Sequence, residues 1–312
     1  MNPLSTIAPV ALVIALGAWL RARGHYAEAF FRDANRLTYW IGLPAMLFRE
    51  VAAAPLRESW AGRLVVVLLA ATLATGLAAG VLARMLRLPP ARAGALITAS
   101  FRGNIAYAGL PIILFALGAA APGGRPWAAI ASLCLGPLVV FYNVACVLLC
   151  AALTHGRGAG ARALLRDVAG NPLILACAAG LAFSFGGLPL PAAAARTLKI
   201  VGDLALPLAL LGLGASLDLA QLRRVRAPAT AAALMKVFFC PLAGWALARW
   251  MGLGPEETLI ALIYLATPSA ISLFVMSAPL GIDEQVTGAA IMLSTLLSAA
   301  PLALVLALFG PA

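Results

Sequence analysis

The sequence predicts an all-α integral membrane protein of ten transmembrane helices, arranged as two inverted five-helix repeats. Of the 312 residues, 63% are hydrophobic and 11% are charged, whereas a soluble domain carries about 25% charged residues. Ten apolar stretches follow one another, each near the roughly 20 residues that cross a bilayer. Short motifs also recur in the same order in the two halves, which predicts an internal repeat.

The apolar stretches give the predicted spans in chain order. They cover residues 4–20, 37–54, 64–83, 93–118, 127–153, 171–187, 198–217, 227–248, 257–280 and 286–309. Glycine or proline interrupts the spans near residues 44, 102 and 268, and proline breaks a helix because it lacks an N–H and clashes with the preceding turn. The start of the chain, Met1-Asn-Pro-Leu, has no basic region, so no cleavable signal peptide is expected.

The basic residues orient the predicted spans. The net charge of +11 would suggest nucleic acid as a partner in a soluble protein, but alternation across the spans explains it, and no nucleic-acid partner is expected. Thirteen of the 22 Lys and Arg residues lie on one side of the spans and seven on the other. By the positive-inside rule, the first side is cytoplasmic.

We therefore expect a multi-pass protein of the cell inner membrane, in the lipid bilayer, with both termini on the non-cytoplasmic side. The thirteen are Arg21, Arg23, Arg32, Arg36, Arg84, Arg87, Arg92, Arg157, Arg162, Arg166, Arg223, Arg224 and Arg226.

Three pairs of motifs define the repeat. Each repeat has five spans, an odd number, so the second enters the membrane from the side opposite to the first. The predicted units are residues 1–153, a cytoplasmic linker at 154–168, and residues 169–312. The paired motifs are Asn2-Pro-Leu4 with Asn171-Pro-Leu173, Gly42–Leu47 with Ala205–Leu210, and the span broken at Pro111 with the span broken at Pro268.

The two broken spans indicate a transport protein. Lipid cannot satisfy freed backbone groups, so a break at membrane depth is tolerated only where it is buried or lines a cavity. A pair of interrupted helices at corresponding positions in two repeats is the best sequence pointer to a transporter's binding site. We therefore take the polar residues near the two breaks as the candidate substrate site.

In the fourth span, Arg102, Gly103 and Asn104 precede Gly109 and Pro111. The Asn104 amide has donors and an acceptor suited to a carboxylate, and a half-helix N-terminus adds positive charge toward an anion. Alternatively, Asn104 only satisfies broken backbone. An arginine in a span is costly unless it faces a cavity or partner. Arg102 either attracts an anion at the cytoplasmic mouth of the site or extends to the membrane surface.

Further candidates come from the ninth, fifth, seventh and eighth spans. Thr267, Ser269 and Ser272 surround Pro268, and their hydroxyls satisfy the backbone, bind substrate, or do both. The amide of Asn143 should face the bundle interior, because an unpaired amide in lipid is expensive.

Asp203 is either a proton- or cation-coupling group or an i,i+4 partner of Lys199. Lys236 compensates a bound anion or pairs with Asp203. The five cysteines have no metal spacing, so neither a metal nor a cofactor is expected.

Several short motifs carry a family resemblance over nearly the whole chain. They are Phe101–Asn104 with Gly109–Pro111, Asn171–Leu173, Leu206–Ser216, Lys236 with Pro241, Ala266–Ser269, and Gly281–Asp283 with Leu293–Thr295. With them the chain resembles the auxin efflux carrier (AEC) family, which contains the plant PIN-FORMED carriers and bacterial malonate- or malate-type permeases.

This resemblance implies the fold of bile-acid sodium symporters and NhaA-type antiporters. In that fold a scaffold domain and a core domain are each drawn from both repeats, and broken helices 4 and 9 cross in the core. Asn104 would lie near the substrate carboxylate, with Pro111 and Pro268 as crossover prolines. The chain lacks the long central loop of the plant carriers and has Arg102 at a position that is not basic there. Both differences favour a small bacterial carboxylate over auxin. Scaffold helices of such folds often dimerise, so a homodimer is a further expectation.

We therefore expect a secondary carrier of small organic anions, mono- or dicarboxylates, that works by elevator-type alternating access around the helix 4/helix 9 crossover. The alternative is a sodium-coupled symporter of larger amphipathic anions, and the coupling ion, H+ or Na+, stays open. An integral membrane enzyme would need an acidic metal- or diphosphate-binding motif or a nucleophile–base pair within the membrane. The sequence offers neither, so no enzymatic activity is expected.

Overall fold

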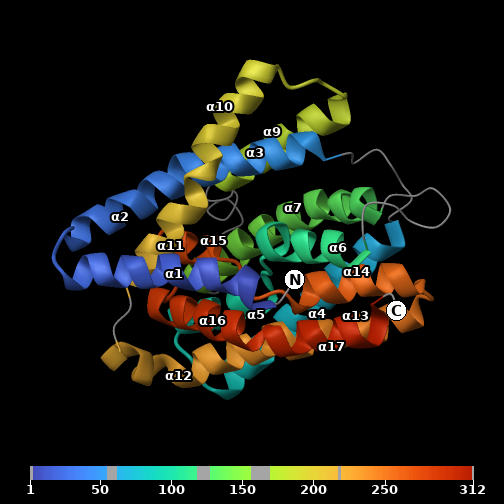
Figure 1. The fold of residues 1–312 in the computed structure, drawn as a ribbon. Helices are drawn as coiled ribbons and strands as arrows, with labels where there is room; N and C mark the ends of the chain where they lie inside the picture. The colour runs from blue at the N-terminus through green and yellow to red at the C-terminus, as the bar shows by residue number, and fades with distance from the viewer. Residues whose placement is uncertain (1–2, 55–61, 118–126, 156–168, 217–218, 311–312) are drawn as a thin grey trace.

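The computed structural model describes residues 3–54, 62–117, 127–155, 169–216 and 219–310, and these residues are almost entirely helical. The α-helices are α1 (Pro3–Ala22), α2 (Glu28–Leu37), α3 (Leu43–Ala53), α4 (Gly62–Met85), α5 (Pro90–Phe101), α6 (Leu110–Leu117), α7 (Trp127–His155), α9 (Pro172–Gly186), α10 (Ala192–Asp203), α11 (Ala205–Ala215), α12 (Leu219–Leu234), α13 (Cys240–Trp250), α14 (Pro255–Ala266), α15 (Ser272–Ser277), α16 (Glu284–Leu297) and α17 (Ala299–Phe309). Figure 1 shows their arrangement. The predicted linker at 154–168 lies outside the described residues beyond His155, where α7 ends.

Three π-helical turns interrupt or join these helices: η1 (Thr38–Gly42), η3 (Ile105–Gly109) and η5 (Met235–Phe239). Each ends two residues before a proline, at Pro44, Pro111 and Pro241 respectively. A proline removes one backbone donor and its ring crowds the carbonyl four residues earlier. A π turn shifts the preceding hydrogen bonds to i→i+5 pairs. The helices therefore continue past these prolines in η1 and η5.

The lengths of the helices fit a membrane-spanning bundle. Five segments in the described part of the chain are long and apolar enough to cross a bilayer: Gly62–Met85, Ile130–Leu153, Ala192–Ala215, Arg224–Trp250 and Glu284–Phe309. Three shorter apolar helical segments are Leu12–Ala22, Ile105–Leu117 and Pro172–Gly186. The first long segment is that of α4, which alone covers about 36 Å at 1.5 Å per residue.

The described helices pack as two groups. In the first group α1 packs against α11, α3 packs against α9 and α10, and α2 packs against α11. In the second group α4 packs against α5 and α13, α12 against α5 and α16, and α14 against α13 and α17. Figure 1 shows α3 beside α9 and α1 beside α11. Contacts between the groups come mainly from α7 and α15, which face α3, α9, η1 and α11.

The centre of the second group is formed by α5 and α14. Every residue from Ala93 to Phe101 and from Thr258 to Ala266 is buried. A helix that is buried on all sides needs neighbours all round rather than a single apolar face. The two predicted breaks follow directly after these helices, so both lie deep inside the molecule.

One end of the bundle gathers basic residues. Arg21 near the end of α1 donates to the carbonyl of Ala215 at the end of α11. Gln285 at the start of α16 donates to the carbonyl of Ser216 over 3.2 Å. Asp283, which precedes α16, forms an ion pair of 3.2 Å with Arg92 on α5. These contacts bring loops from both halves of the chain to one end, which we call the basic end.

Candidate functional site

The two broken segments cross and pair with each other. Helix α5 ends at Phe101 and η3 begins at Ile105, while α14 ends at Ala266 and α15 begins at Ser272. The linking residues run antiparallel, with a bridge between Gly103 and Ser269. The Asn104 N–H donates to the Pro268 carbonyl over 2.8 Å, and the Ala270 N–H donates to the Arg102 carbonyl over 2.9 Å. Each break therefore satisfies part of the backbone of the other.

Hydroxyl groups satisfy further backbone atoms at the second break. The Thr267 hydroxyl donates to the Tyr264 carbonyl over 2.7 Å, and the Ser269 hydroxyl donates to the Ala99 carbonyl over 2.7 Å. The Ser294 hydroxyl accepts from the Ser269 N–H at 3.0 Å. Thr267 and Ser269 are fully buried, and both hydroxyls are used inside the protein. This geometry corresponds to the backbone-satisfying role predicted for these two residues.

Two glycines allow the close approach of the crossing segments. A β-carbon on Gly103 would lie 2.7 Å from the Thr267 hydroxyl oxygen and 3.1 Å from Lys236 Cε. A β-carbon on Gly109 would lie 2.6 Å from Cδ1 of the Tyr264 ring. Contacts this short are closer than van der Waals separation, so a larger residue would push the segments apart.

Lys236 lies behind the crossing. Its side chain is fully buried, and its ammonium donates to the Leu265 carbonyl in the last turn of α14. The C-terminal carbonyls of a helix carry partial negative charge, which a cation stabilises. The predicted partner Asp203 instead pairs with Lys199 over 2.5 Å and with Arg49 over 4.0 Å. Asp203 is exposed on α10, so the structure contains the predicted i,i+4 pair.

A cavity of about 60 Å³ opens beside the crossing, and we call it the crossover cavity. One wall comes from Arg102, Asn104 and Tyr107 at the first break, with Asn143 of α7 and Ser272 of α15. The opposite wall comes from α3 and α11, so the cavity lies between the two groups of helices. In this conformation it has room for a few water molecules. Of the predicted substrate-binding residues, Arg102, Asn104, Asn143 and Ser272 line it, whereas Thr267 and Ser269 do not.

Arg102 is held rigidly in the wall of this cavity. Its side chain donates to Asn143 Oδ1 and to the Ser272 hydroxyl, each over 3.2 Å. Asn143 is itself fixed by a hydrogen bond of 2.8 Å to the Val139 carbonyl. Arg102 is only 5% exposed, so it points inward rather than to the membrane surface. Its Nε atom is buried without a hydrogen-bond partner, and the described residues give it no ion pair.

Asn104 stands at the start of η3. Its backbone is not helical, and its side chain does not cap the following turn. In the described part of the chain its backbone N–H donates to the Pro268 carbonyl, and its side-chain amide forms no hydrogen bond with another described residue. The amide faces the same small cavity as the Arg102 guanidinium. Together the two side chains present a fixed positive charge and additional hydrogen-bonding groups, which suit a carboxylate.

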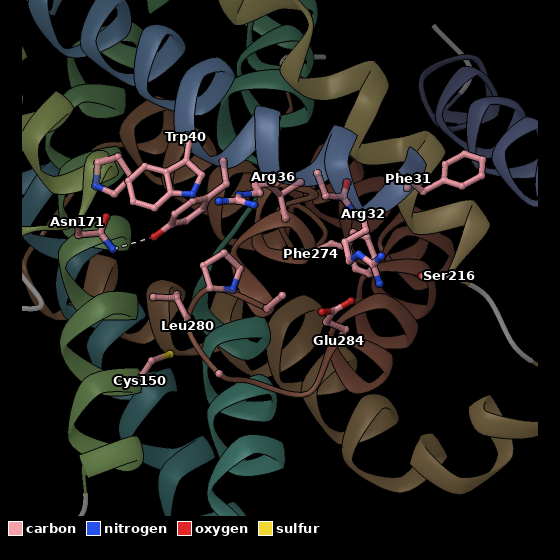
Figure 2. Close-up of a pocket in the computed structure, with 18 of the residues that line it drawn as sticks. Phe31, Arg32, Arg36, Trp40, Cys150, Asn171, Ser216, Phe274, Leu280 and Glu284 are labelled. Carbon is pink, nitrogen blue, oxygen red and sulfur yellow. Dashed lines mark hydrogen bonds between the residues drawn. The ribbon is translucent and has the colours of Figure 1, made fainter. Parts of the chain in front are cut away.

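A second, larger cavity of about 980 Å³ opens near the basic end, and we call it the vestibule. Figure 2 shows Arg32 and Arg36 of α2 reaching into it, with Glu284 and Phe274 near Arg32. Asn171 donates to the Tyr39 hydroxyl over 3.0 Å at one side. The vestibule could not be predicted from the sequence, because its walls come from helices far apart in the chain.

The vestibule and the crossover cavity follow one another along the same helices. On α7, Val147 lines the vestibule and Asn143 the crossover cavity, one helical turn away. On α15, Phe274 lines the first and Ser272 the second. Both cavities also have one wall from each group of helices. The two cavities therefore lie one after the other between the two groups of helices.

Glu50 is a residue of the cavity lining that is not among the candidates predicted from the sequence. The structure puts it in the lining of the crossover cavity, together with Leu43, Met46 and Leu47 of the same helix. These four residues follow the i, i+3, i+4, i+7 spacing of one helix face. That spacing was readable in the sequence, but the direction in which the face points was not.

A helical bundle with two broken segments that cross in its interior, a buried arginine and two successive cavities is consistent with a membrane transport protein. A family model described as "Membrane transport protein" matches residues 4–155 and 160–306. The chain belongs to this family, the auxin efflux carrier family. It is a multi-pass membrane protein, and its family points to a transporter rather than an enzyme.

Two relatives are similar over most of the chain. One, from Rhizobium meliloti (strain 1021), bears the name "Putative malonate transporter" and is 27% identical over 279 residues, 85% of this chain and 83% of its own length. The other, from Methanocaldococcus jannaschii, bears the name of an uncharacterized transporter. It is 22% identical over 322 residues, 99% of this chain and 98% of its own length.

Proposed function

We propose that this protein is a secondary carrier of small organic anions, mono- or dicarboxylates, with the substrate bound at the crossover. The observation that carries the proposal is Arg102, a buried guanidinium in the cavity wall with no carboxylate partner among the described residues. A buried guanidinium without a directly bonded carboxylate is costly, and a bound anion would pair with it directly. The malonate named for the Rhizobium relative has the required chemistry.

The proposed mechanism is elevator-type alternating access. The group containing α1, α2, α3, α9, α10 and α11 would be the scaffold, and the group containing the crossing would be the moving core. The location of both cavities between these groups supports this assignment. In the described conformation the vestibule leads toward the site from the basic end, so this conformation would be open on that side.

The proposed topology is ten spans in two inverted repeats. In chain order, α1, α2–α3, α4, α5–α6 and α7 would correspond to α9, α10–α11, α12–α13, α14–α15 and α16–α17. The packing supports this correspondence, since α1 of the first repeat contacts α11 of the second, and α9 of the second contacts α3 of the first. By the positive-inside rule the basic end would be cytoplasmic, with both termini outside the inner membrane.

A ligand screen tests the proposed substrate class. The purified protein is heated with acetate, malonate, succinate or malate, with and without sodium, and the melting temperature Tm is recorded. A ligand that binds the folded state raises Tm with its occupancy. We expect at least one carboxylate to raise Tm, whereas malonamide, an uncharged analogue of malonate, does not. Equal shifts with malonate and malonamide, or no shift across the panel, would contradict an anion site.

A further inference from the structure

Glu50 is a second charged group of the crossover cavity, and anion binding by Arg102 and Asn104 does not account for it. It lies on α3, in the wall opposite the crossing, and lines the same cavity as Arg102 and Tyr107. Its side chain is half-buried, and the described residues give it no hydrogen bond or ion pair. The cavity therefore contains one cation and one acid that do not form a direct contact.

Arg102 is the cation that lines the same cavity as Glu50. Arg49, the neighbour of Glu50 in the chain, also acts on the Glu50 carboxyl group and forms an ion pair of 4.0 Å with Asp203, which is also held by Lys199. The other titratable groups facing α3 from neighbouring elements are neutral in their ordinary forms. They are Tyr39 on η1, Tyr107 on η3, Tyr142 and Cys146 on α7, and Cys177 on α9.

We propose that Glu50 is the proton-carrying group of the carrier, an inference that rests on the proposed function. In the empty carrier the Glu50 carboxylate balances the charge of Arg102 across the cavity. An arriving substrate carboxylate takes over that balance, and Glu50 takes up one proton from the aqueous phase. For a monocarboxylate the bound state then holds the substrate anion, the Arg102 cation and a neutral Glu50, so the net charge of the cavity is unchanged. A dicarboxylate such as malonate adds one further negative charge, which favours protonation of Glu50 more strongly.

The physical basis is repulsion between two carboxylates in one small cavity. Like charges that share a poorly solvated site disfavour ionisation of both groups. Anion binding therefore favours protonation of Glu50, and by reciprocity protonation of Glu50 favours anion binding. Affinity should be highest where Glu50 is protonated and should fall as the pH rises through its titration. For one linked proton the limiting slope is about tenfold in Kd per pH unit.

The test measures proton uptake on binding. The full-length protein in detergent is titrated with malonate by calorimetry, in buffers of different ionisation enthalpy, between pH 5.5 and 8.5. The dependence of the heat on the buffer gives the number of protons taken up. We expect the wild type to take up close to one proton per malonate at a pH where free Glu50 is ionised, whereas E50Q takes up none. The Kd of E50Q should not rise with pH as steeply as the Kd of the wild type. Because malonate itself titrates equally in both experiments, the difference between the two proteins reports protonation of Glu50.

Two further variants make the result specific. E50D restores a carboxyl group and should restore proton uptake. This variant shows whether the loss in E50Q comes from the missing carboxyl group rather than from a folding defect. D203N removes an acid on the neighbouring helix, outside the cavity lining, and should take up protons like the wild type. Proton uptake by E50Q equal to that of the wild type, its loss in D203N, or malonate binding by the wild type without proton uptake would each overturn the proposal. No carboxylate binding by the wild type would instead overturn the proposed function, and this proposal with it.

Discussion

Arg102 shows how a costly residue can be built into a membrane protein. Its guanidinium is fixed by Asn143 and Ser272, so it is held in place before any ligand arrives. A hydrogen bond to a charged group contributes about 1.5–3 kcal/mol, which corresponds to roughly a 10- to 100-fold change in affinity.

We expect R102Q to weaken malonate binding by at least about tenfold on that scale. R102K, which keeps the charge but loses the planar fork, should lose less. Calorimetric titration measures both. The matched control is R249Q, on an exposed arginine of α13, which should bind like the wild type. Wild-type affinity in R102Q would remove Arg102 from the site.

Lys236 is expected to stabilise the folded protein through its hydrogen bond to the Leu265 carbonyl. Replacing it by methionine keeps an unbranched side chain and leaves the Leu265 carbonyl at the end of α14 without its donor. An unsatisfied buried acceptor costs about 1–3 kcal/mol. We therefore expect K236M to lower Tm clearly in detergent. In comparison, K199M removes only an exposed i,i+4 pair, worth about 0.2–0.5 kcal/mol. An unchanged or higher Tm in K236M would mean that burying the ammonium costs more than its hydrogen bond contributes.

At the level of elements, the crossing depends on how closely two extended segments approach. G103A puts a β-carbon 2.7 Å from the Thr267 hydroxyl oxygen, next to the hydrogen bonds that pair the segments. We expect G103A to lower both Tm and malonate affinity. G80A is the matched control on α4, because the nearest atom to its β-carbon is 3.9 Å away. If both variants behave alike, the close approach at Gly103 has no special importance.

The sequence predicts the breaks better than it predicts their contacts. Glycine and proline near Asn104 and Pro268 are enough to end both helices. The hydrogen bonds between the breaks could not be predicted, because each joins residues from different halves of the chain. The two alternatives for Arg102 also stayed open in the sequence, since its partner Asn143 comes from a different span. By contrast, the spacing of Leu43, Met46, Leu47 and Glu50 places them on one helix face in the sequence alone. That this face lines the crossover cavity could not be predicted.

At the level of the whole molecule, arginines line both the vestibule and the crossover cavity. The vestibule opens at the basic end, where Arg32 and Arg36 face it. Three arginines and two glutamates line the vestibule. A cleft with an excess of one sign of charge concentrates ions of the other sign and speeds their arrival, an effect that salt screens. The size of the vestibule could not be predicted, because it depends on how two groups of helices pack rather than on any single segment.

The orientation in the membrane can be tested by labelling. Ser216 lines the vestibule, whereas Arg249 is exposed near the end of α13, which the proposed topology places on the opposite side. The five native cysteines are buried, so background reaction with a membrane-impermeant maleimide should be low. We expect S216C to be labelled in inverted vesicles and R249C in right-side-out vesicles, with the unaltered protein as control. The reverse pattern would reverse the proposed topology.

The central claim is that a small carboxylate crosses the membrane by binding at the crossover, and counterflow tests it most directly. Liposomes that contain the protein and unlabelled malonate are placed in labelled malonate, and uptake of the label is followed. The account predicts transient accumulation by the wild type, competition by carboxylates but not by malonamide, and no accumulation by N104A. Equal accumulation by N104A would contradict the crossover site, and failure of the wild type to exchange any carboxylate of the panel would contradict the proposed function.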